Sequence, residues 1–208
     1  RQIAFVALGD GASRLWLRRL DATVAQPLAG TDGASYPFWS PDGQSVGFFA
    51  GSTLKRMDIG GGAPQTLADA ASGRGGAWSP DGTILFARSS GGPLLRVSAS
   101  GGEPVAVTRL DKQNSHRFPQ FLPGGRQFLF YAIGTPETGG IHLGSLDSPE
   151  TKRLAAADTA GVYSSDGWLL FIRAGTLLAQ RVDLSRGELT GAPVTVADPV
   201  TFDAGNYV

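Results

Sequence analysis

The sequence contains no cysteine and no excess of either charge. Without cysteine, the chain can form no disulfide, use no thiolate nucleophile and build no cysteine-ligated metal centre. Lys plus Arg and Asp plus Glu each number 18, and there is no basic run of the kind that binds nucleic acid or an anionic membrane surface. The composition therefore predicts no nucleic-acid partner, and it leaves the cellular compartment unknown.

Long apolar segments are missing as well. No apolar run approaches the roughly 20 residues that a helix needs to cross a bilayer, and the first residues, RQIAFVALGD, lack the layout of a signal peptide. The chain starts without Met, directly on a strand-like pattern. We expect no membrane insertion, and we expect the chain to be a fragment of a larger protein.

The sequence is rich in turn-forming residues, with 30 Gly and 13 Pro placed between short apolar runs. One phrase recurs: YPFWSPDGQSVGFFA at 36–50 returns as GGAWSPDGTILFA at 75–87, and two weaker copies follow. Aligned on Gly43, Gly82, Gly125 and Gly167, the copies are 39, 43 and 42 residues apart. A period of about 40–45 residues is typical of β-propeller blades.

The second copy predicts the strands of one blade at 36–40, 44–50, 53–59 and 64–68. In the turn between the first two strands, Pro fixes φ, Asp bonds its own backbone and Gly takes the positive φ. We interpret seven residues as structural parts of these turns rather than as catalytic acids: Asp42, Gly43, Asp81, Gly82, Gly125, Asp166 and Gly167.

The repeats predict an all-β chain, a single β-propeller domain (1–208) of four-stranded antiparallel blades. Five blades are expected, at about 35–73, 74–115, 116–159, 160–202, and 1–34 completed by 203–208. In this arrangement the C-terminal segment pairs with residues 2–7 and closes the first blade, which removes an open sheet edge. The alternative is an incomplete arc of a six- or seven-bladed propeller.

The repeated Trp-Ser-Pro-Asp-Gly phrase followed by an apolar strand resembles the WD-like repeat of TolB-type propellers. With HRFPQFLPGGRQFLFY and LTGAPVTVAD, it is most similar to the propeller attached to bacterial serine/threonine protein kinases, although no kinase motif is present. The resemblance covers essentially the whole chain. It implies a sensor or interaction domain, and by analogy an extracytoplasmic location.

Candidate ligand-binding residues begin with His116, which lies just before the first strand of its blade, the strand that lines the channel of a propeller. His116 and Arg117 align with Ser35-Tyr36, with Gly73-Arg74 and with Gly205-Asn206. We therefore predict a ligand site at the channel mouth formed by Tyr36, Arg74, His116, Arg117 and Asn206. The alternative is that these side chains only hydrogen-bond neighbouring blades.

No catalytic, phosphate-binding or metal-ligand motif is present in the sequence. The prediction is a non-enzymatic β-propeller binding, interaction or sensor module without metal or cofactor, and monomeric. Its partner is expected to be a protein, a peptide or a small polar ligand. The alternative function is a glycan-active enzyme similar to glycoside hydrolases, which requires two carboxylates at the channel mouth.

Overall fold

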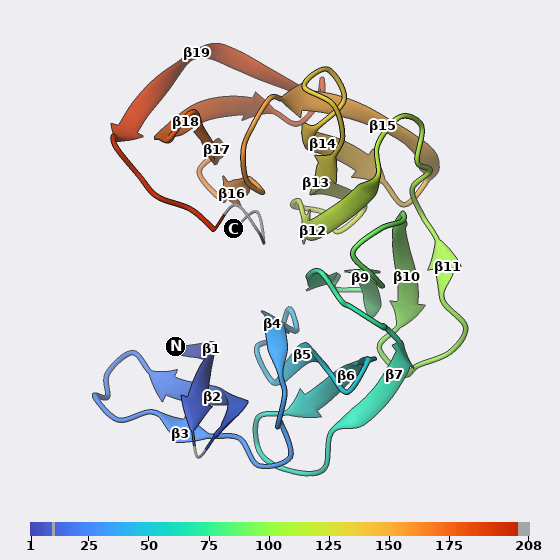
Figure 1. Ribbon diagram of the computed structural model, residues 1–208, viewed down its shortest axis with the longest axis vertical. Coiled ribbons are helices and arrows are strands. Elements are labelled where there is room, and N and C mark those ends of the chain that lie inside the picture. The colour runs from blue at the N-terminus through green and yellow to red at the C-terminus, as the bar shows by residue number, and fades with distance from the viewer. Residues whose placement is uncertain (10, 204–208) are drawn as a thin grey trace. The chain divides into compact units, whose positions relative to one another are not determined.

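The computed structural model describes residues 1–9 and 11–203, and every regular element in this part of the chain is a β-strand. The strands form five antiparallel sheets, four of four strands and one of three, each in chain order (Figure 1). This confirms the predicted fold class, an all-β, five-bladed β-propeller. We call the four strands of a blade a to d, in chain order. No helix long and apolar enough to cross a membrane occurs among the described residues.

The bounds of the strands follow the repeat. The first sheet contains β1 (Gln2–Gly9), β2 (Ala12–Arg19) and β3 (Gln26–Pro27). The second contains β4 (Ser35–Trp39), β5 (Ser45–Ala50), β6 (Thr53–Asp58) and β7 (Gln65–Asp69). The third contains β8 (Gly76–Trp78), β9 (Thr83–Ala87), β10 (Leu94–Ser98) and β11 (Val105–Ala106). The fourth contains β12 (Ser115–Phe121), β13 (Gln127–Ile133), β14 (Gly140–Ser145) and β15 (Ser148–Ala155). The fifth contains β16 (Val162–Ser164), β17 (Trp168–Arg173), β18 (Thr176–Asp183) and β19 (Glu188–Ala197).

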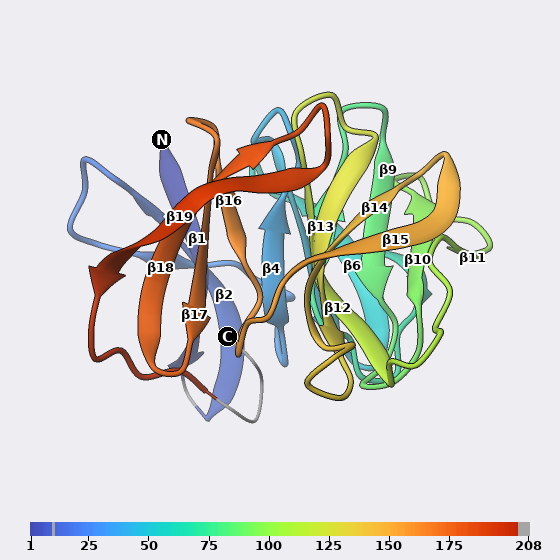
Figure 2. The same cartoon turned by 90° about the horizontal axis from the view of Figure 1, so that it is seen from above.

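The chain forms two compact units. The first unit comprises residues 1–90 and 95–105, and the second comprises 91–94 and 106–208. In the second unit β19 is a long outer strand beside β18 (Figure 2). Of the segment 203–208, which was predicted to close the first blade, residues 204–208 lie outside the described residues, so this prediction stays untested.

The cores lie between sheets, and the b strands explain why. In β5 every residue of SVGFFA is buried, because both faces of this strand are covered and an alternating pattern is not needed. In the first unit, Phe49 and Leu54 of the second sheet pack with Ile84 and Phe86 of the third. In the second unit, Leu129 and Ile141 pack with Leu169 and Phe171. Such fully buried apolar side chains are worth about 1.5–3 kcal/mol each.

The repeated turn joins strands a and b in the same way in four sheets. Gly43, Gly82, Gly125 and Gly167 have φ values of 68°, 84°, 66° and 86°. The amide of each glycine donates to the carbonyl three residues earlier, at 2.9–3.0 Å. In the second sheet the Asp42 carboxylate also accepts bonds from the Ser40 hydroxyl (2.6 Å) and from the Gln44 amide (3.0 Å). These bonds tie the turn to the first residues of strand b.

Candidate functional site

Two of the residues predicted at the channel mouth, Tyr36 and Arg74, meet in the first unit. The Arg74 guanidinium carbon lies 5.9 Å from the centre of the Tyr36 ring, in cation–π geometry. Its Nη1 donates to the carbonyl of Gly73 at 3.0 Å, and its buried Nε has no hydrogen-bond partner among the described residues. Both side chains are half-buried. The cation–π contact and the hydrogen bond to the neighbouring Gly73 carbonyl therefore fix the position of the Arg74 side chain.

The strand register corrects the sequence alignment of these positions by one residue. Ser35 pairs with Phe49, and Arg117 pairs with Tyr131, six residues after the turn glycine in each sheet. Arg117 is thus equivalent to Ser35, and Tyr36 is equivalent to Phe118. Tyr36 and Phe118 both have positive φ, 48° and 51°, where each strand a shifts its register. A bulky residue at positive φ is strained, so this bulge is a second feature that recurs between blades.

The other predicted site residues belong to the second unit or lie outside the described residues. His116 and Arg117 are part of β12, and were expected just before it. Arg117 is 8% exposed and its Nε donates to the Ser115 hydroxyl at 3.0 Å. His116 is completely buried. Asn206 is not among the described residues. Whether Tyr36, Arg74, His116, Arg117 and Asn206 act together as one site stays a prediction.

His116 belongs to a buried layer with Phe130 and His142, contributed by the three neighbouring strands β12, β13 and β14. The ring centre of Phe130 lies 4.6 Å from that of His116 and 5.4 Å from that of His142. Burial lowers the pKa of His142, and burial together with the charge of His142 lowers the pKa of His116 to about 4. Both imidazoles are therefore neutral near pH 7.

A hydrogen bond fixes the tautomer of the His142 ring. The Nε2 atom of His142 lies 3.0 Å from the Thr138 carbonyl, which only accepts, so Nε2 carries the proton. The Thr108 hydroxyl accepts from the Leu94 amide and shares a hydrogen bond of 2.8 Å with Nδ1 of His116. Two buried nitrogens, Nε2 of His116 and Nδ1 of His142, remain without a partner among the described residues. Such atoms are uncommon and costly in a folded protein.

The b–c loop beside His142 is longer than those of the second and fifth sheets. Strands b and c are joined by two residues there, 51–52 and 174–175, but by six residues in the third sheet, 88–93, and in the fourth, 134–139. Arg153 of β15 holds this longer loop, because its Nε and Nη2 each donate at 2.7 Å to the carbonyls of Gly139 and Pro136. The Thr138 hydroxyl also accepts from the Thr135 amide at 3.0 Å. The insertion is therefore an ordered loop with fixed partners.

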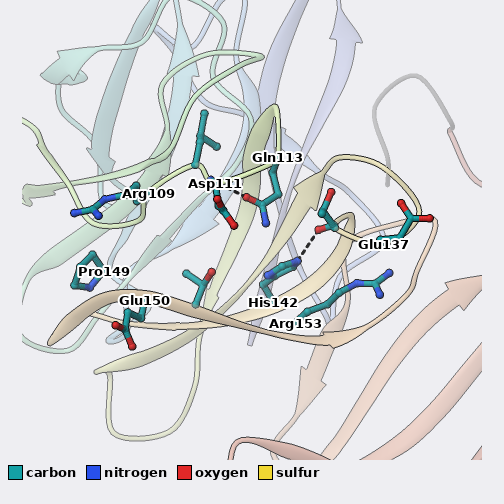
Figure 3. A pocket seen from close by; sticks show the side chains of 11 residues that line it. Arg109, Asp111, Gln113, Glu137, His142, Pro149, Glu150 and Arg153 are labelled. Carbon is teal, nitrogen blue, oxygen red and sulfur yellow. Dashed lines mark hydrogen bonds between the residues drawn. The ribbon is translucent and has the colours of Figure 1, made fainter.

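A pocket of about 570 Å³ lies beside this loop in the second unit (Figure 3). His142 lies at its floor, the 134–139 loop and β15 form two sides, and the connection 107–114 covers a third. The connection is held to the loop by the Thr138 hydroxyl, 3.5 Å from the Lys112 carbonyl. The lining residues are Arg109, Leu110, Asp111, Gln113, Glu137, Thr138, His142, Pro149, Glu150, Thr151 and Arg153.

The lining is polar and carries both charges. Arg109 and Arg153 supply guanidinium groups, and Asp111, Glu137 and Glu150 supply carboxylates. The Thr135 hydroxyl holds the pKa of Glu137 below its usual value, so this carboxylate is ionised at neutral pH. In the described part of the chain, no three His, Asp or Glu side chains come together as a metal site. The pocket is thus suited to bind a charged or hydrogen-bonding ligand.

Sequence reasoning missed this pocket because it searched for positions that recur in every blade. None of its residues was predicted as a site. A usable signal was present in the interval between repeats: TPETGG has no counterpart in the second blade, where Gly51-Ser52 alone joins the strands. Insertions in single repeats commonly mark the binding face of a repeat protein.

Comparison with solved structures shows that the fold is similar to that of other β-propellers. TolB from Acinetobacter baumannii has a TM-score of 0.72 and 15% sequence identity, covering 88% of this chain and 49% of that one. A chain of a nidogen/laminin complex is also similar, with a TM-score of 0.67 and 12% identity, over 87% of this chain and 72% of that one. No protein-family model and no curated protein matches the chain. The chain spans about half the length of the TolB structure.

The comparison overturns one prediction, that the chain is not an enzyme. An oligogalacturonate lyase in complex with manganese has a TM-score of 0.68 and 14% identity, covering 94% of this chain and 61% of that one. The same fold therefore carries catalysis in other chains. The prediction was wrong because it treated the absence of familiar motifs as an exclusion, whereas a propeller builds its sites from loops of different blades.

Proposed function

We propose that the chain is a β-propeller binding module whose ligand site is the pocket beside the 134–139 loop. One observation carries the proposal: the 134–139 loop, one of two six-residue b–c connections, borders the pocket and is tied down by Arg153. Its volume of about 570 Å³ falls within the range of about 300–1,000 Å³ for ligand sites. The expected partner is a protein, a peptide or a small polar ligand.

The rigidity of the pocket walls supports this proposal. Arg153 holds the loop through two charge-assisted hydrogen bonds, and the His142 floor is fixed through Thr138. A preformed site binds more tightly because less conformational entropy is lost when the ligand enters. The resemblance to kinase-attached propellers supports a sensor role within a larger protein, and Tyr36 with Arg74 is proposed as a separate contact site in the first unit.

An NMR titration tests the proposed site. We expect a mixture of short peptides and small polar compounds to shift the backbone amide signals of 109–113, 137–142 and 150–153 in ¹⁵N-labelled protein. A Thr151→Trp variant, which fills the pocket, should fold and lose these shifts. The matched control is Thr190→Trp, an exposed substitution on β19 away from the pocket, which should keep them. Shifts confined to the first unit, or unchanged in Thr151→Trp, contradict the proposal.

A further inference from the structure

We infer that this pocket binds a peptide segment that carries an acidic and a basic side chain close together. The inference rests on the proposed binding function and adds the chemical class of the ligand. It starts from the charges of the lining, two guanidinium groups and three carboxylates in one pocket of about 570 Å³. Positive and negative groups line the same pocket. A ligand that carries charge of one sign only is therefore repelled by the lining groups of that sign.

The charged groups are distributed over different walls. Arg109 and Asp111 belong to the connection before β12, and Glu150 belongs to β15 on the other side of the pocket (Figure 3). Arg153 lies toward the 134–139 loop with Glu137 (Figure 3). An acidic side chain of the ligand is therefore expected to meet a guanidinium group, while a basic side chain meets Asp111 or Glu150. Charge-assisted hydrogen bonds of this kind are shorter and stronger than those between neutral groups.

The lining also provides a donor for a peptide backbone. The Gln113 side-chain oxygen accepts a hydrogen bond from the Asp111 amide at 3.1 Å, which leaves the Nε2 amide as a donor directed to other partners. Along β15, residues 149–151 face only Gly144 of β14, because Leu143 pairs with Lys152 and Ser145 pairs with Ser148. This bulge borders the pocket, but Pro149 has no backbone N–H and the Glu150 amide donates to the Ser148 hydroxyl at 3.2 Å, so the donor for a peptide carbonyl is the Gln113 side chain. A peptide carbonyl fits such surroundings.

Other ligand classes fit the lining less well. A phosphate-bearing ligand is repelled by the three carboxylates. An apolar ligand finds only Leu110 and Pro149 among the described lining residues. A sugar ring commonly stacks on an aromatic face, and the described lining holds no Trp, Tyr or Phe. The mixture of charges and the amide donor therefore favour a peptide.

Four peptides of equal length test the inference by isothermal titration calorimetry. All are acetylated and amidated, and have the pattern Gly-X-Gly-Z-Gly, with X and Z as Glu and Lys, both Glu, both Lys, or both Gln. We expect the peptide with Glu and Lys to bind about tenfold more tightly than the Gln peptide, which corresponds to about 1.4 kcal/mol. Added salt should weaken its binding and leave the Gln peptide nearly unchanged.

Charge-reversing substitutions in the pocket show which lining residue binds the acidic side chain of the peptide and which binds the basic one. Arg109→Glu should weaken the peptide with Glu and Lys about tenfold and improve the binding of the double-Lys peptide. Asp111→Lys should do the opposite, improving the double-Glu peptide. The control Arg186→Glu reverses an exposed arginine in the β18–β19 connection of the same unit and should change neither.

The outcomes separate this inference from the proposed function. Equal affinity for the Gln peptide, with the pocket amides still shifting, overturns the inference and leaves the binding site intact. Small polar compounds that shift the pocket amides while no peptide binds overturn it in the same way. If neither peptides nor small polar compounds shift these amides, both the inference and the proposed function are wrong.

Discussion

The a–b turns and the fourth sheet both use glycine at positive φ, but for different reasons. Each repeated turn places a glycine at positive φ, and at Gly43 a β-carbon would meet no atom within 4 Å. In the fourth sheet Gly140 also has positive φ, 118°, but there a β-carbon would lie 2.2 Å from the Ala155 carbonyl oxygen. The first glycine is needed for conformation alone, and the second also for close packing of β14 against β15.

The same contrast separates the polar groups of the two regions. In the turn, Asp42 is exposed and bonded to its own hairpin. In the fourth sheet, His116 and His142 are buried, and each keeps one nitrogen without a partner among the described residues. The polar groups of the repeated turn are thus satisfied locally, whereas the fourth sheet buries two imidazoles around one aromatic ring and leaves one nitrogen of each without a partner among the described residues. Such costs persist where a protein uses them.

The largest effect is expected for Gly140→Val. The new side chain combines an unfavourable positive φ with a clash against backbone, and backbone at Ala155 cannot move without breaking the β14–β15 ladder. We expect a loss of more than about 3 kcal/mol in the free energy of unfolding, measured by urea denaturation. The control is Gly43→Val, which has the strain without the clash. Equal losses of unfolding free energy in Gly140→Val and Gly43→Val would show that close packing around Gly140 adds nothing to the cost.

The buried histidine predicts a pH dependence confined to the irregular region. Because the pKa of His116 falls to about 4 in the folded state, against about 6.5 when unfolded, protons bind the unfolded chain more tightly. Stability is therefore full above pH 6.5 and is lost as the pH falls toward 4, by about 3 kcal/mol for this group. His116→Gln keeps a hydrogen-bonding group beside Thr108. It should remove this part of the change of unfolding free energy with pH.

The measurement is the free energy of unfolding between pH 4 and 7 for both proteins. His142→Gln should reduce the slope further in the same direction, because burial lowers the pKa of His142 as well. Parallel curves for the original protein and His116→Gln would mean that water reaches His116.

The sequence predicted the parts of the fold that repeat. Strands expected at 36–40, 44–50, 53–59 and 64–68 are found as β4 to β7 with boundaries shifted by at most one residue. This works because short apolar runs and the Pro-Asp-Gly turns between them are local signals. The alignment of Ser35-Tyr36 with His116-Arg117 was wrong by one residue, although the sequence contained the correct one. Tyr36 and Phe118 both lie seven residues before the turn glycine, Gly43 or Gly125.

The candidate pocket was not predictable in the same way. It depends on Arg153 reaching back to the carbonyls of Pro136 and Gly139, 17 and 14 residues earlier. It also depends on the position of the 107–114 connection beside that loop. No local pattern marks either contact. His116 and Arg117 were noticed as unusual residues, but their burial follows from packing within the fourth sheet.

A smaller effect is expected in the repeated turn. Gly43→Val forces a branched side chain to a φ of 68° in open space, which should cost about 1–3 kcal/mol. Gly43→Asn should cost less, because Asn tolerates the left-handed region. Thermal unfolding followed by circular dichroism gives both values. A melting temperature for Gly43→Val equal to that of the original protein would refute the role assigned to this turn.

The smallest effect is expected for Asp42→Ala. The hydrogen bond from the Ser40 hydroxyl is the main cause that lowers the pKa of the Asp42 carboxyl, and the Gln44 amide is the second. The folded state therefore favours the ionised form. The stabilisation is present above the ordinary pKa and is lost as the pH falls through the lowered one. The difference in melting temperature between the original protein and Asp42→Ala should therefore be small at pH 7 and shrink as the pH falls below 4. Asp42→Asn, which keeps an oxygen acceptor without a charge, should fall between the two at pH 7 and show no such titration. A difference in melting temperature that grows on acidification would mean that Ser40 and Gln44 do not stabilise the ionised Asp42 carboxylate. The turn would then not satisfy its own polar groups, and the comparison with the buried histidines of the fourth sheet would fail.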